Sequence, residues 1–377
     1  MGKHVGISAM GFYIPRHYIA IEKLLEARGE DPAKATRGLG LERMAILASN
    51  EDSISMAANA VENLDFDRDR VGKLIFATEC GCDSAKDNAT YLHELAGLSE
   101  NCEAYDIKAA CAAGTYAVWQ VIDWILSGRG KGKLGIVVCS DKAVYEYQSS
   151  AEITGGGGAV ALLVEEEPQI LRFNFEAGDY KRNVRDFWKP LGCECAIVAD
   201  DGVPSVTCYL EALAAAYSNY LQAGGSSNFD YLVFHTPYSK MVHKAFNALA
   251  DLIPEIKGKF ESMTAGSLKV PSLVGNIYNG ALYLALASLL EQYQEMIRGK
   301  KIGFYSFGSG CSSKFFTGIV QNECNPTFNL LDQLKRMKPI SPKDYERYRQ
   351  GDLLLQETQG FLLNGVDQQQ YRVYTKK

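Results

Sequence analysis

The chain has 377 residues, of which 47% are hydrophobic and 22% are charged, and its formal net charge is −6. These values are ordinary for a globular protein with a large core, and the length predicts two or three domain-sized units. The negative charge gives no basic face for nucleic acid, and no apolar run has the length of a membrane span or a signal-peptide core. We therefore expect a cytosolic (cytoplasmic) protein without nucleic-acid or membrane partners.

The ten cysteines predict reduced thiols rather than a disulfide framework, because the sequence shows no secretory signal. Two close pairs, Cys80/Cys82 and Cys193/Cys195, have a spacing of one residue, whereas zinc sites use spacings of two to four residues together with nearby histidines. No histidine lies near either pair. We expect no metal site.

Apolar strands and helices recur in the same order in the two halves of the chain. In the first half we expect strand 74–79, helix 115–126, strand 132–140, a glycine turn at 155–158 and strand 159–164. In the second half we expect strand 232–237, helix 278–292, strand 300–307, a glycine turn at 308–310 and strand 315–320. Near-continuous apolar strands are typical of α/β sheets that are buried on both faces. The pattern predicts a duplicated α/β unit, with halves at residues 1–168 and 169–377.

Chemically useful side chains lie where these strands end. Glu79 ends the first strand of the first half, and His235 lies near the end of the corresponding strand in the second half. If a pseudo-two-fold axis relates the halves, the carboxyl ends of these strands converge on one cleft. Cys111 and Asn276 would then begin a pair of helices at the same place.

Cys111 lies in a tight turn of small residues that precedes helix 115–126. The unpaired N–H groups and the dipole at a helix N-terminus favour the thiolate over the thiol, and small neighbours let a substrate carbonyl approach the sulfur. This pattern predicts a nucleophile. A buried structural cysteine is the alternative interpretation, because free cysteine is among the most buried residue types.

Seven segments, in order along the chain, resemble the thiolase fold and, within it, the 3-hydroxy-3-methylglutaryl-CoA synthase family. They are Ala77-Thr78-Glu79, Ala110-Cys111 followed by Gly114-Thr115, and the segments 186–190, 209–213, 235–240, 274–278 and 306–310. The resemblance runs from about residue 5 to the end of the chain. It implies a layered αβαβα sandwich of two βαβαβ halves and a homodimer.

The resemblance also implies an acyltransferase that condenses acetyl-CoA with acetoacetyl-CoA and water to 3-hydroxy-3-methylglutaryl-CoA and CoA, with no cofactor. Cys111 would take the acetyl group from acetyl-CoA. Glu79 would remove a proton from the acetyl methyl group and act as an acid later, which suits a carboxylate whose pKa is raised by burial. His235 would hold and polarise the ketone of the second substrate, and water would release the product from the enzyme.

Further positions match substrate-binding positions of the family. The backbone N–H groups of Cys111 and Ser309 resemble an oxyanion hole. The remaining matches are Tyr145 and Asn276 in the cleft, Lys240 and Lys244 for the phosphates or adenine of CoA, and Lys189 in the segment 186–190. For Lys240 and Lys244, a solvated charge on a helix face is the alternative interpretation.

Two positions beside the predicted chemistry depart from the family pattern. Ala112 follows the nucleophile where an aromatic residue is common, and Cys80 follows Glu79 where serine is typical. A small residue beside Cys111 is expected to widen the acyl pocket and to admit a group bulkier than acetyl.

A branch of the family that uses acyl carrier protein in polyketide β-branching is the main alternative. The segment 306–313 and the triplet His235-Thr236-Pro237 favour that branch, whereas Lys240 and the segment 186–190 favour the CoA-dependent, mevalonate-type enzyme. We favour the CoA-dependent enzyme.

Three more distant functions remain. A thiolase needs a second cysteine before a C-terminal glycine turn, but Cys311 follows its glycines. A ketoacyl synthase would use Cys111, His235 and Asn276 but would not need Glu79. A non-catalytic scaffold that binds CoA thioesters is the third, and its Cys111 should react with iodoacetamide no faster than the other thiols.

Near the C-terminus, Tyr345, Glu346 and Arg347 lie in a charged stretch that predicts a closing helix. The mostly apolar residues 360–365 predict an edge strand. Neither segment is assigned any chemistry.

Overall fold

The computed structural model describes residues 4–324 and 328–377, and its largest sheet has nine strands in the order β11-β12-β13-β8-β1-β7-β6-β4-β5. The strands of this sheet are β1 Val5–Tyr13, β4 Val71–Ala77, β5 Glu103–Ile107, β6 Leu134–Ala143, β7 Gly156–Glu166, β8 Leu171–Lys181, β11 Tyr231–Phe234, β12 Lys301–Gly308 and β13 Ser312–Val320. The helices are α1 Ile21–Ala27, α2 Ser53–Glu62, α3 Asn88–Leu95, α4 Ala113–Leu126, α5 Val203–Gln222, α6 Ser239–Leu252, α7 Phe260–Met263, α8 Pro271–Val274, α9 Ala281–Tyr293, α10 Leu330–Arg336 and α11 Pro342–Arg349.

The strand pairing of the first half is repeated in the second half. β4 is parallel to β6, β6 is antiparallel to β7, and β7 is antiparallel to β1. In the same way β11 is parallel to β12, β12 is antiparallel to β13, and β13 is antiparallel to β8. The duplication that the sequence predicts is therefore confirmed. β7 ends at Glu166 and β8 begins at Leu171, so the predicted boundary between residues 168 and 169 falls in the turn that joins them.

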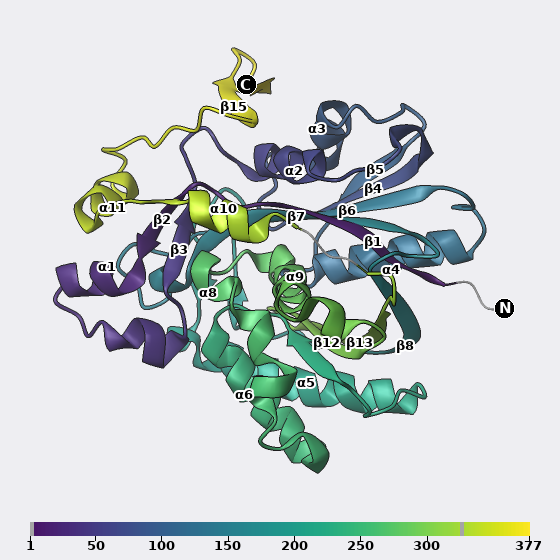
Figure 1. Cartoon of the computed structure of the whole chain (residues 1–377). Coiled ribbons are helices and arrows are strands. Elements are labelled where there is room, and N and C mark those ends of the chain that lie inside the picture. Colours follow the sequence, from purple (N-terminus) through teal and green to yellow (C-terminus); the bar gives the residue numbers. More distant parts are fainter. Residues whose placement is uncertain (1–3, 325–327) are drawn as a thin grey trace.

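Each group of strands is covered by helices on both faces. Successive side chains of a strand point to opposite sides of the sheet, so an apolar strand packs against helices on both sides. In β4, Ile75 and Ala77 contribute to the central core, whereas Leu74 and Phe76 pack with the outer helices α2 and α3. On the other side of the molecule, α5 and α6 pack against β11, β12 and β13. Figure 1 shows the resulting layers, with α2 and α3 above, α4 and α9 in the middle, and α5 and α6 below. The predicted αβαβα sandwich is confirmed.

The two central helices begin near the functional residues. α9 is buried from Ala281 to Leu290, all but its last three residues, as expected for a helix with strands on both sides. α4 is buried along the face that contacts α9 and the strands of the first half. Both helices begin on the side of the sheet where β4 and β11 have their C-terminal ends.

Smaller elements surround this framework. Three strands, β2 His17–Ala20, β3 Arg43–Ile46 and β14 Lys338–Pro339, form a second sheet beside α1 and α11, and β9 Phe187–Trp188 pairs with β10 Ile197–Val198. The charged stretch near the C-terminus forms α11, as predicted. The predicted edge strand is present as β15 Phe361–Val366, which pairs with β16 Arg372–Lys376 in a hairpin separate from the large sheet.

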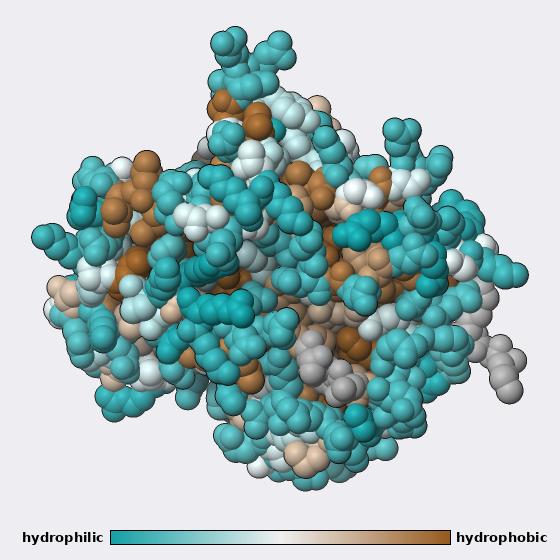
Figure 2. Space-filling model, turned by 45° about the horizontal axis from the view of Figure 1, so that its top comes forward, coloured by the Kyte–Doolittle hydropathy of each residue, from teal (hydrophilic) through white to brown (hydrophobic). Residues whose placement is uncertain are grey.

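Among residues 4–324 and 328–377, no helix is long and apolar enough to cross a membrane. Figure 2 shows a face on which hydrophilic residues predominate and hydrophobic residues form scattered patches.

Candidate active site

The turn that precedes α4 holds Cys111 in place. α4 has its N-cap at Ala112, so Cys111 is the residue before the cap, close to its predicted position. Ala110 adopts a left-handed conformation with φ of 47°, which is uncommon for a residue other than glycine and costs backbone energy. Hydrogen bonds from Ala112 N to Ala109 O and from Ala113 N to Ala110 O, both 3.2 Å, close the turn.

Cys111 and Glu79 form the central contact of the site. The Cys111 Sγ donates a hydrogen bond to Glu79 Oε1 at 2.9 Å. Burial and the neighbouring Asp141 raise the pKa of Glu79 to about 7. Burial and the nearby Glu79 carboxylate raise the pKa of Cys111 well above its usual value. The expectation of a thiolate is therefore wrong for the free site, because desolvation and Glu79 outweigh the helix dipole.

Asp141 lies behind Glu79 and is completely buried. Its Oδ1 accepts hydrogen bonds from Glu79 N at 2.7 Å and from the Thr78 hydroxyl at 2.8 Å. Its Oδ2 accepts two more from Asn279, from the backbone N at 3.2 Å and from Nδ2 at 3.0 Å. The Asn279 Oδ1 accepts a bond from Gly114 N at 3.0 Å, so the first turn of α4 and the end of β4 are tied to one buried carboxyl group.

His235 immediately follows β11 and is 3% exposed. Its backbone is held at both ends, because His235 N donates to Tyr305 O at 2.8 Å and the Tyr209 hydroxyl donates to His235 O at 2.7 Å. Burial lowers the pKa of His235 to about 3, so the ring is neutral at physiological pH. Its Nδ1 has no hydrogen-bond partner within the described residues, and a buried ring nitrogen without a partner is available to a ligand.

A cavity of about 510 Å³ brings most of the predicted residues together. Its lining includes the predicted residues Cys111, Tyr145, His235, Lys244, Asn276 and Ser309. Beside Cys111, the rings of Tyr145, Phe187 and Tyr278 contact one another edge to face, with centroids between 5.9 and 6.4 Å apart. The Asn276 Nδ2 lies 3.5 Å from the Tyr145 hydroxyl. Predicted catalytic residues and aromatic side chains from both halves therefore surround one space.

Three predicted residues do not line this cavity. Glu79 lies behind the Cys111 sulfur, and Lys189 Nζ lies 3.6 Å from Cys80 Sγ, close enough to Glu79 to favour its carboxylate. Lys240 is exposed and is not among the lining residues, whereas Lys244, one helical turn later, is exposed and lines the cavity. The roles of Lys189 and Lys240 in substrate binding stay predictions.

Comparison with known proteins gives consistent matches along the whole chain. Family models described as hydroxymethylglutaryl-coenzyme A synthase N terminal and C terminal match residues 1–169 and residues 173–255 and 250–377. The chain is 35% identical to the hydroxymethylglutaryl-CoA synthase of Enterococcus faecalis over 83% of this chain and 82% of that protein. It is 31% identical to the polyketide biosynthesis 3-hydroxy-3-methylglutaryl-ACP synthase PksG of Bacillus subtilis, over 90% of this chain and 87% of PksG.

Solved structures agree. MvaS in complex with 3-hydroxy-3-methylglutaryl coenzyme A is 34% identical and superposes with a TM-score of 0.89, with 100% of both chains covered. The curacin biosynthetic pathway HMG synthase in complex with holo donor-ACP is 28% identical with a TM-score of 0.89, over 99% of this chain and 100% of that one. The chain belongs to the hydroxymethylglutaryl-CoA synthase family. It is therefore an enzyme with the thiolase-like fold, as its motifs predict.

The two departures from the family pattern have structural explanations. Ala112 is 1% exposed and is not among the residues that line the cavity, and the expected widening of the acyl pocket stays a prediction. Gly308 packs tightly over the backbone of residues 109–112. Cys80 exchanges hydrogen bonds with the backbone of Lys142, and burial raises its pKa to about 12, so this second cysteine stays a thiol at neutral pH.

Replacing Gly308 by alanine should displace the nucleophile of this hydroxymethylglutaryl-CoA synthase homologue. A Cβ at Gly308 would lie 2.5 Å from Ala109 O and 2.8 Å from Ala112 N, closer than a real Cβ contact allows, and 3.0 Å from Cys111 N. Because small misplacements of reacting groups cost up to about 100-fold, we expect Cys111 acetylation to slow by about 10- to 100-fold. Gly38→Ala is the control, since its Cβ would meet only Lys34 Cγ at 3.8 Å. Acetylation at the wild-type rate in Gly308→Ala would contradict this packing.

The rate of condensation should rise with pH and level off above about pH 7, the pKa of Glu79. Glu79 must be ionised to accept a proton, and its raised pKa means that this form is lost as the pH falls through about 7 rather than through the usual range near 4. A series of kcat/KM values for the condensation, measured between about pH 5.5 and about pH 9, checks this. A profile that stays flat over this range would exclude Glu79 as the base.

Sequence reasoning missed several residues of the site in this synthase homologue. Asp141 directly follows the predicted strand 132–140, at the same sheet edge as Glu79, so the signal was present and was not used. Tyr278 is buried in the cavity wall and has a left-handed φ of 46° two residues after Asn276. The role of Asn279 depends on the approach of two helices, which local sequence does not reveal. Within the described residues, no three His, Cys, Asp or Glu side chains are placed to hold a metal ion.

Proposed function

We propose that the chain condenses acetyl-CoA with acetoacetyl-CoA and water to 3-hydroxy-3-methylglutaryl-CoA and CoA, through an acetyl-Cys111 intermediate. The hydrogen bond between Cys111 Sγ and Glu79 Oε1 at 2.9 Å carries this proposal, because it joins a nucleophile and a base in one contact. His235 belongs to the same cavity, on the side that the second half of the chain provides.

The first step transfers the acetyl group. As the Cys111 sulfur attacks the acetyl-CoA carbonyl, Glu79 accepts the thiol proton and passes it to the departing CoA sulfur. The backbone N–H groups of Cys111 and Ser309 stabilise the oxyanion that forms on the carbonyl oxygen. One thioester replaces another, so the step costs little free energy and returns Glu79 to its ionised form.

The second step makes the carbon–carbon bond. Glu79 removes a proton from the acetyl methyl group, and the resulting carbanion attacks the C3 ketone of acetoacetyl-CoA. His235 is neutral at physiological pH, so it acts as a hydrogen-bond donor that polarises the ketone rather than as a source of a full proton. Glu79 returns its proton to the new alkoxide, and water then hydrolyses the Cys111 thioester.

The test uses purified protein with acetyl-CoA and acetoacetyl-CoA, and it follows free CoA and the product by mass spectrometry. Equal amounts of CoA and 3-hydroxy-3-methylglutaryl-CoA are expected. Formation of acetyl-Cys111 without any condensation would contradict the proposed acceptor.

An acceptor bound to acyl carrier protein is the second candidate. It is favoured by the similarity to PksG, which is named a 3-hydroxy-3-methylglutaryl-ACP synthase. The similar curacin HMG synthase is in complex with holo donor-ACP, so a carrier protein is also a candidate for the acetyl donor. Acetylated Cys111 that condenses with acetoacetyl-carrier protein but not with acetoacetyl-CoA would identify this function. A non-catalytic scaffold would give neither product.

The proposal also includes a homodimer and a cytosolic location. β5 lies at one edge of the large sheet, and four of its five residues are only partly buried, which suits pairing with a second copy. All ten cysteines are unpaired, which suits a reducing compartment. Light scattering of the purified protein tests the first point, and cell fractionation tests the second.

A further inference from the structure

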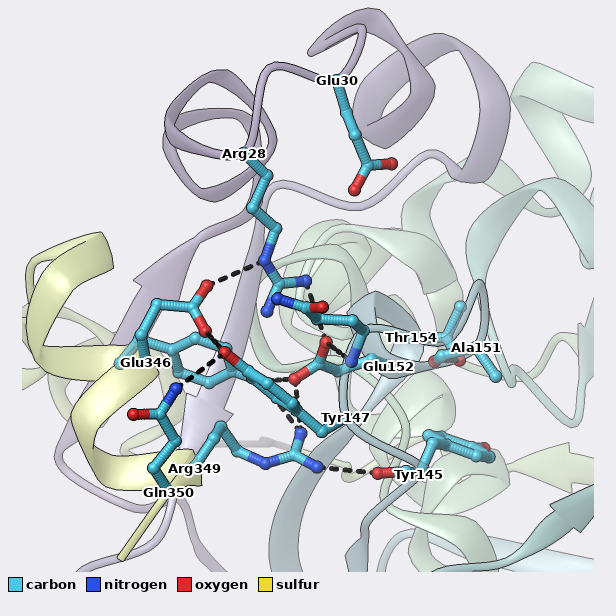
Figure 3. A network of polar contacts seen from close by, with 12 residues as sticks. Arg28, Glu30, Tyr145, Tyr147, Ala151, Glu152, Thr154, Glu346, Arg349 and Gln350 are labelled. Atoms are coloured by element: carbon cyan, nitrogen blue, oxygen red, sulfur yellow. Dashed lines mark hydrogen bonds and ion pairs between the residues drawn. The ribbon is translucent and has the colours of Figure 1, made fainter. Parts of the chain in front are cut away.

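One wall of the active-site cavity is formed by residues 145–154, between β6 and β7. Tyr145, Ser150, Ala151 and Thr154 of this segment line the cavity. Other side chains of the same segment, Tyr147 and Glu152, bind Arg28, the C-cap of α1, and residues of α11 in a polar network that Figure 3 shows. The segment therefore has one face toward the substrates and another toward two peripheral helices.

Glu152 is the centre of this network and is 1% exposed. Its Oε1 accepts hydrogen bonds from Arg349 Nη1 at 2.6 Å and from the Tyr345 hydroxyl at 2.8 Å. Its Oε2 accepts from Arg28 Nη1 at 2.8 Å and from Gln148 N at 2.8 Å. A buried carboxylate tolerates desolvation only when it is paired and fully hydrogen-bonded, and these four donors meet that requirement.

Arg349 also makes a contact with the cavity wall that the neutralisation of Glu152 does not require. Its Nη2 donates to the backbone oxygen of Tyr145 at 2.8 Å, across 204 residues of sequence. The planar guanidinium thus binds Glu152 through Nη1 and Tyr145 O through Nη2, two contacts that its fixed geometry permits at the same time (Figure 3). Arg349 does not line the cavity, so it has no direct contact with a substrate there.

A second tie holds the same segment from the same helix. Glu346 lies one turn before Arg349 on α11, and it accepts hydrogen bonds from the Tyr147 hydroxyl and from Arg28 Nε, the latter at 2.8 Å. Residues of α11 therefore hydrogen-bond to the cavity wall at both Tyr145 and Tyr147.

Tyr145 connects the contacts with α11 to the proposed nucleophile Cys111. It packs in a buried cluster with Cys111 and Tyr278, and its hydroxyl lies 3.5 Å from Asn276 Nδ2. Moving the Tyr145 backbone would move this hydroxyl relative to the sulfur.

We propose that Arg349 is a positioning residue, which fixes Tyr145 against Cys111 by holding the Tyr145 carbonyl and Glu152 in one guanidinium group. The proposal rests on the proposed function, because it assigns Arg349 an effect on the condensation. The network would then do more than attach α11 to the rest of the molecule.

Arg349→Lys tests this. Lysine keeps a cation beside buried Glu152 but lacks the two-pronged geometry that reaches Tyr145 O at the same time. We expect kcat per acetylatable Cys111 to fall by about tenfold or more, while KM for both thioesters changes by less than about twofold. Arg347→Lys is the matched control, since Arg347 lies on the same helix, is half exposed and pairs with Asp344 at 3.6 Å. A purely structural role would lower the number of acetylatable sites and leave kcat per site unchanged, which would overturn the proposal.

A double-mutant cycle with Tyr145→Phe identifies the route. If Arg349 acts through the Tyr145 hydroxyl, Arg349→Lys should have little further effect in the Tyr145→Phe background. Independent, multiplying effects of the two substitutions would overturn the proposal.

Hydrogen exchange separates failure of this inference from failure of the proposed function. If the wild-type protein makes no 3-hydroxy-3-methylglutaryl-CoA, the proposed function fails, and the backbone amides of residues 145–154 still report on Arg349. They should exchange faster in Arg349→Lys than in the wild type and in Arg347→Lys. Equal exchange in all three proteins would overturn the positioning role.

Discussion

Cys111→Ala is expected to accept no acetyl group from acetyl-CoA and to lose condensation by a factor on the order of 10⁴ or more. The reason is that the Cys111 sulfur forms the bond to the acetyl carbon, and the substitution leaves Glu79 without a nucleophile to deprotonate. Radiolabelled acetyl-CoA followed by peptide mapping measures the result. Labelled Cys111→Ala protein would refute the assignment of the nucleophile.

A matched control for this variant is Cys193→Ala, because Cys193 is an exposed thiol. Its acetylation and condensation should equal those of the wild type. Acetylation is also a better test than alkylation by iodoacetamide. Since Cys111 stays protonated in the free site, slow alkylation would be expected of an active enzyme and of a scaffold alike. Acetyl transfer distinguishes them, because Glu79 removes the thiol proton during the reaction itself.

Much of the fold was predictable from the apolar runs of the sequence and from the order in which they repeat. Strands buried on both faces must be apolar almost throughout, so β6 and β12 are visible as apolar runs, and their repeated order indicates the duplication. The partner of the C-terminal strand was not predictable in the same way. Residues 360–365 are apolar like an edge strand, but the local sequence does not show that β15 packs on α2 and pairs with β16 rather than with the large sheet.

The site was predictable where side chains lie directly at strand or helix ends, as Glu79, Cys111 and His235 do. Their protonation states were not predictable from local pattern. The helix N-terminus argued for a thiolate at Cys111, but burial and the contact with Glu79 have the larger effect. Arg349 shows the other limit, because its contact with Tyr145 depends on how α11 docks and has no local signature.

Glu79→Gln should still be acetylated at Cys111 but should condense about 10²- to 10⁴-fold more slowly than the wild type. Glutamine keeps the shape of the side chain and removes its charge. Burial and the Glu79 carboxylate both raise the pKa of Cys111, and the substitution removes only the second cause. The thiol then ionises more readily than it would beside the carboxylate, and its proton passes to water or to the departing CoA sulfur. Acetylation should therefore reach full stoichiometry, although more slowly. The methyl group of the acetyl thioester is a far weaker acid and has no such route.

Single-turnover experiments separate the two steps. Acetyl-enzyme is formed first and isolated, acetoacetyl-CoA is added, and product is followed by mass spectrometry. Glu62→Gln is the control, since Glu62 ends α2, pairs with Lys376 at the surface and does not line the active-site cavity. Near-wild-type condensation by Glu79→Gln would show that Glu79 is not the base of the condensation step.

The pH dependence of condensation tests whether Glu79, with its raised pKa, is the base. In the wild type, activity should fall as the pH drops through about 7, because Glu79 becomes protonated there. In Glu79→Gln, the residual condensation has no such group, so its fall near pH 7 should disappear. A variant that keeps this fall would place the titrating group elsewhere, and the contact between Cys111 and Glu79 would then serve acetyl transfer alone.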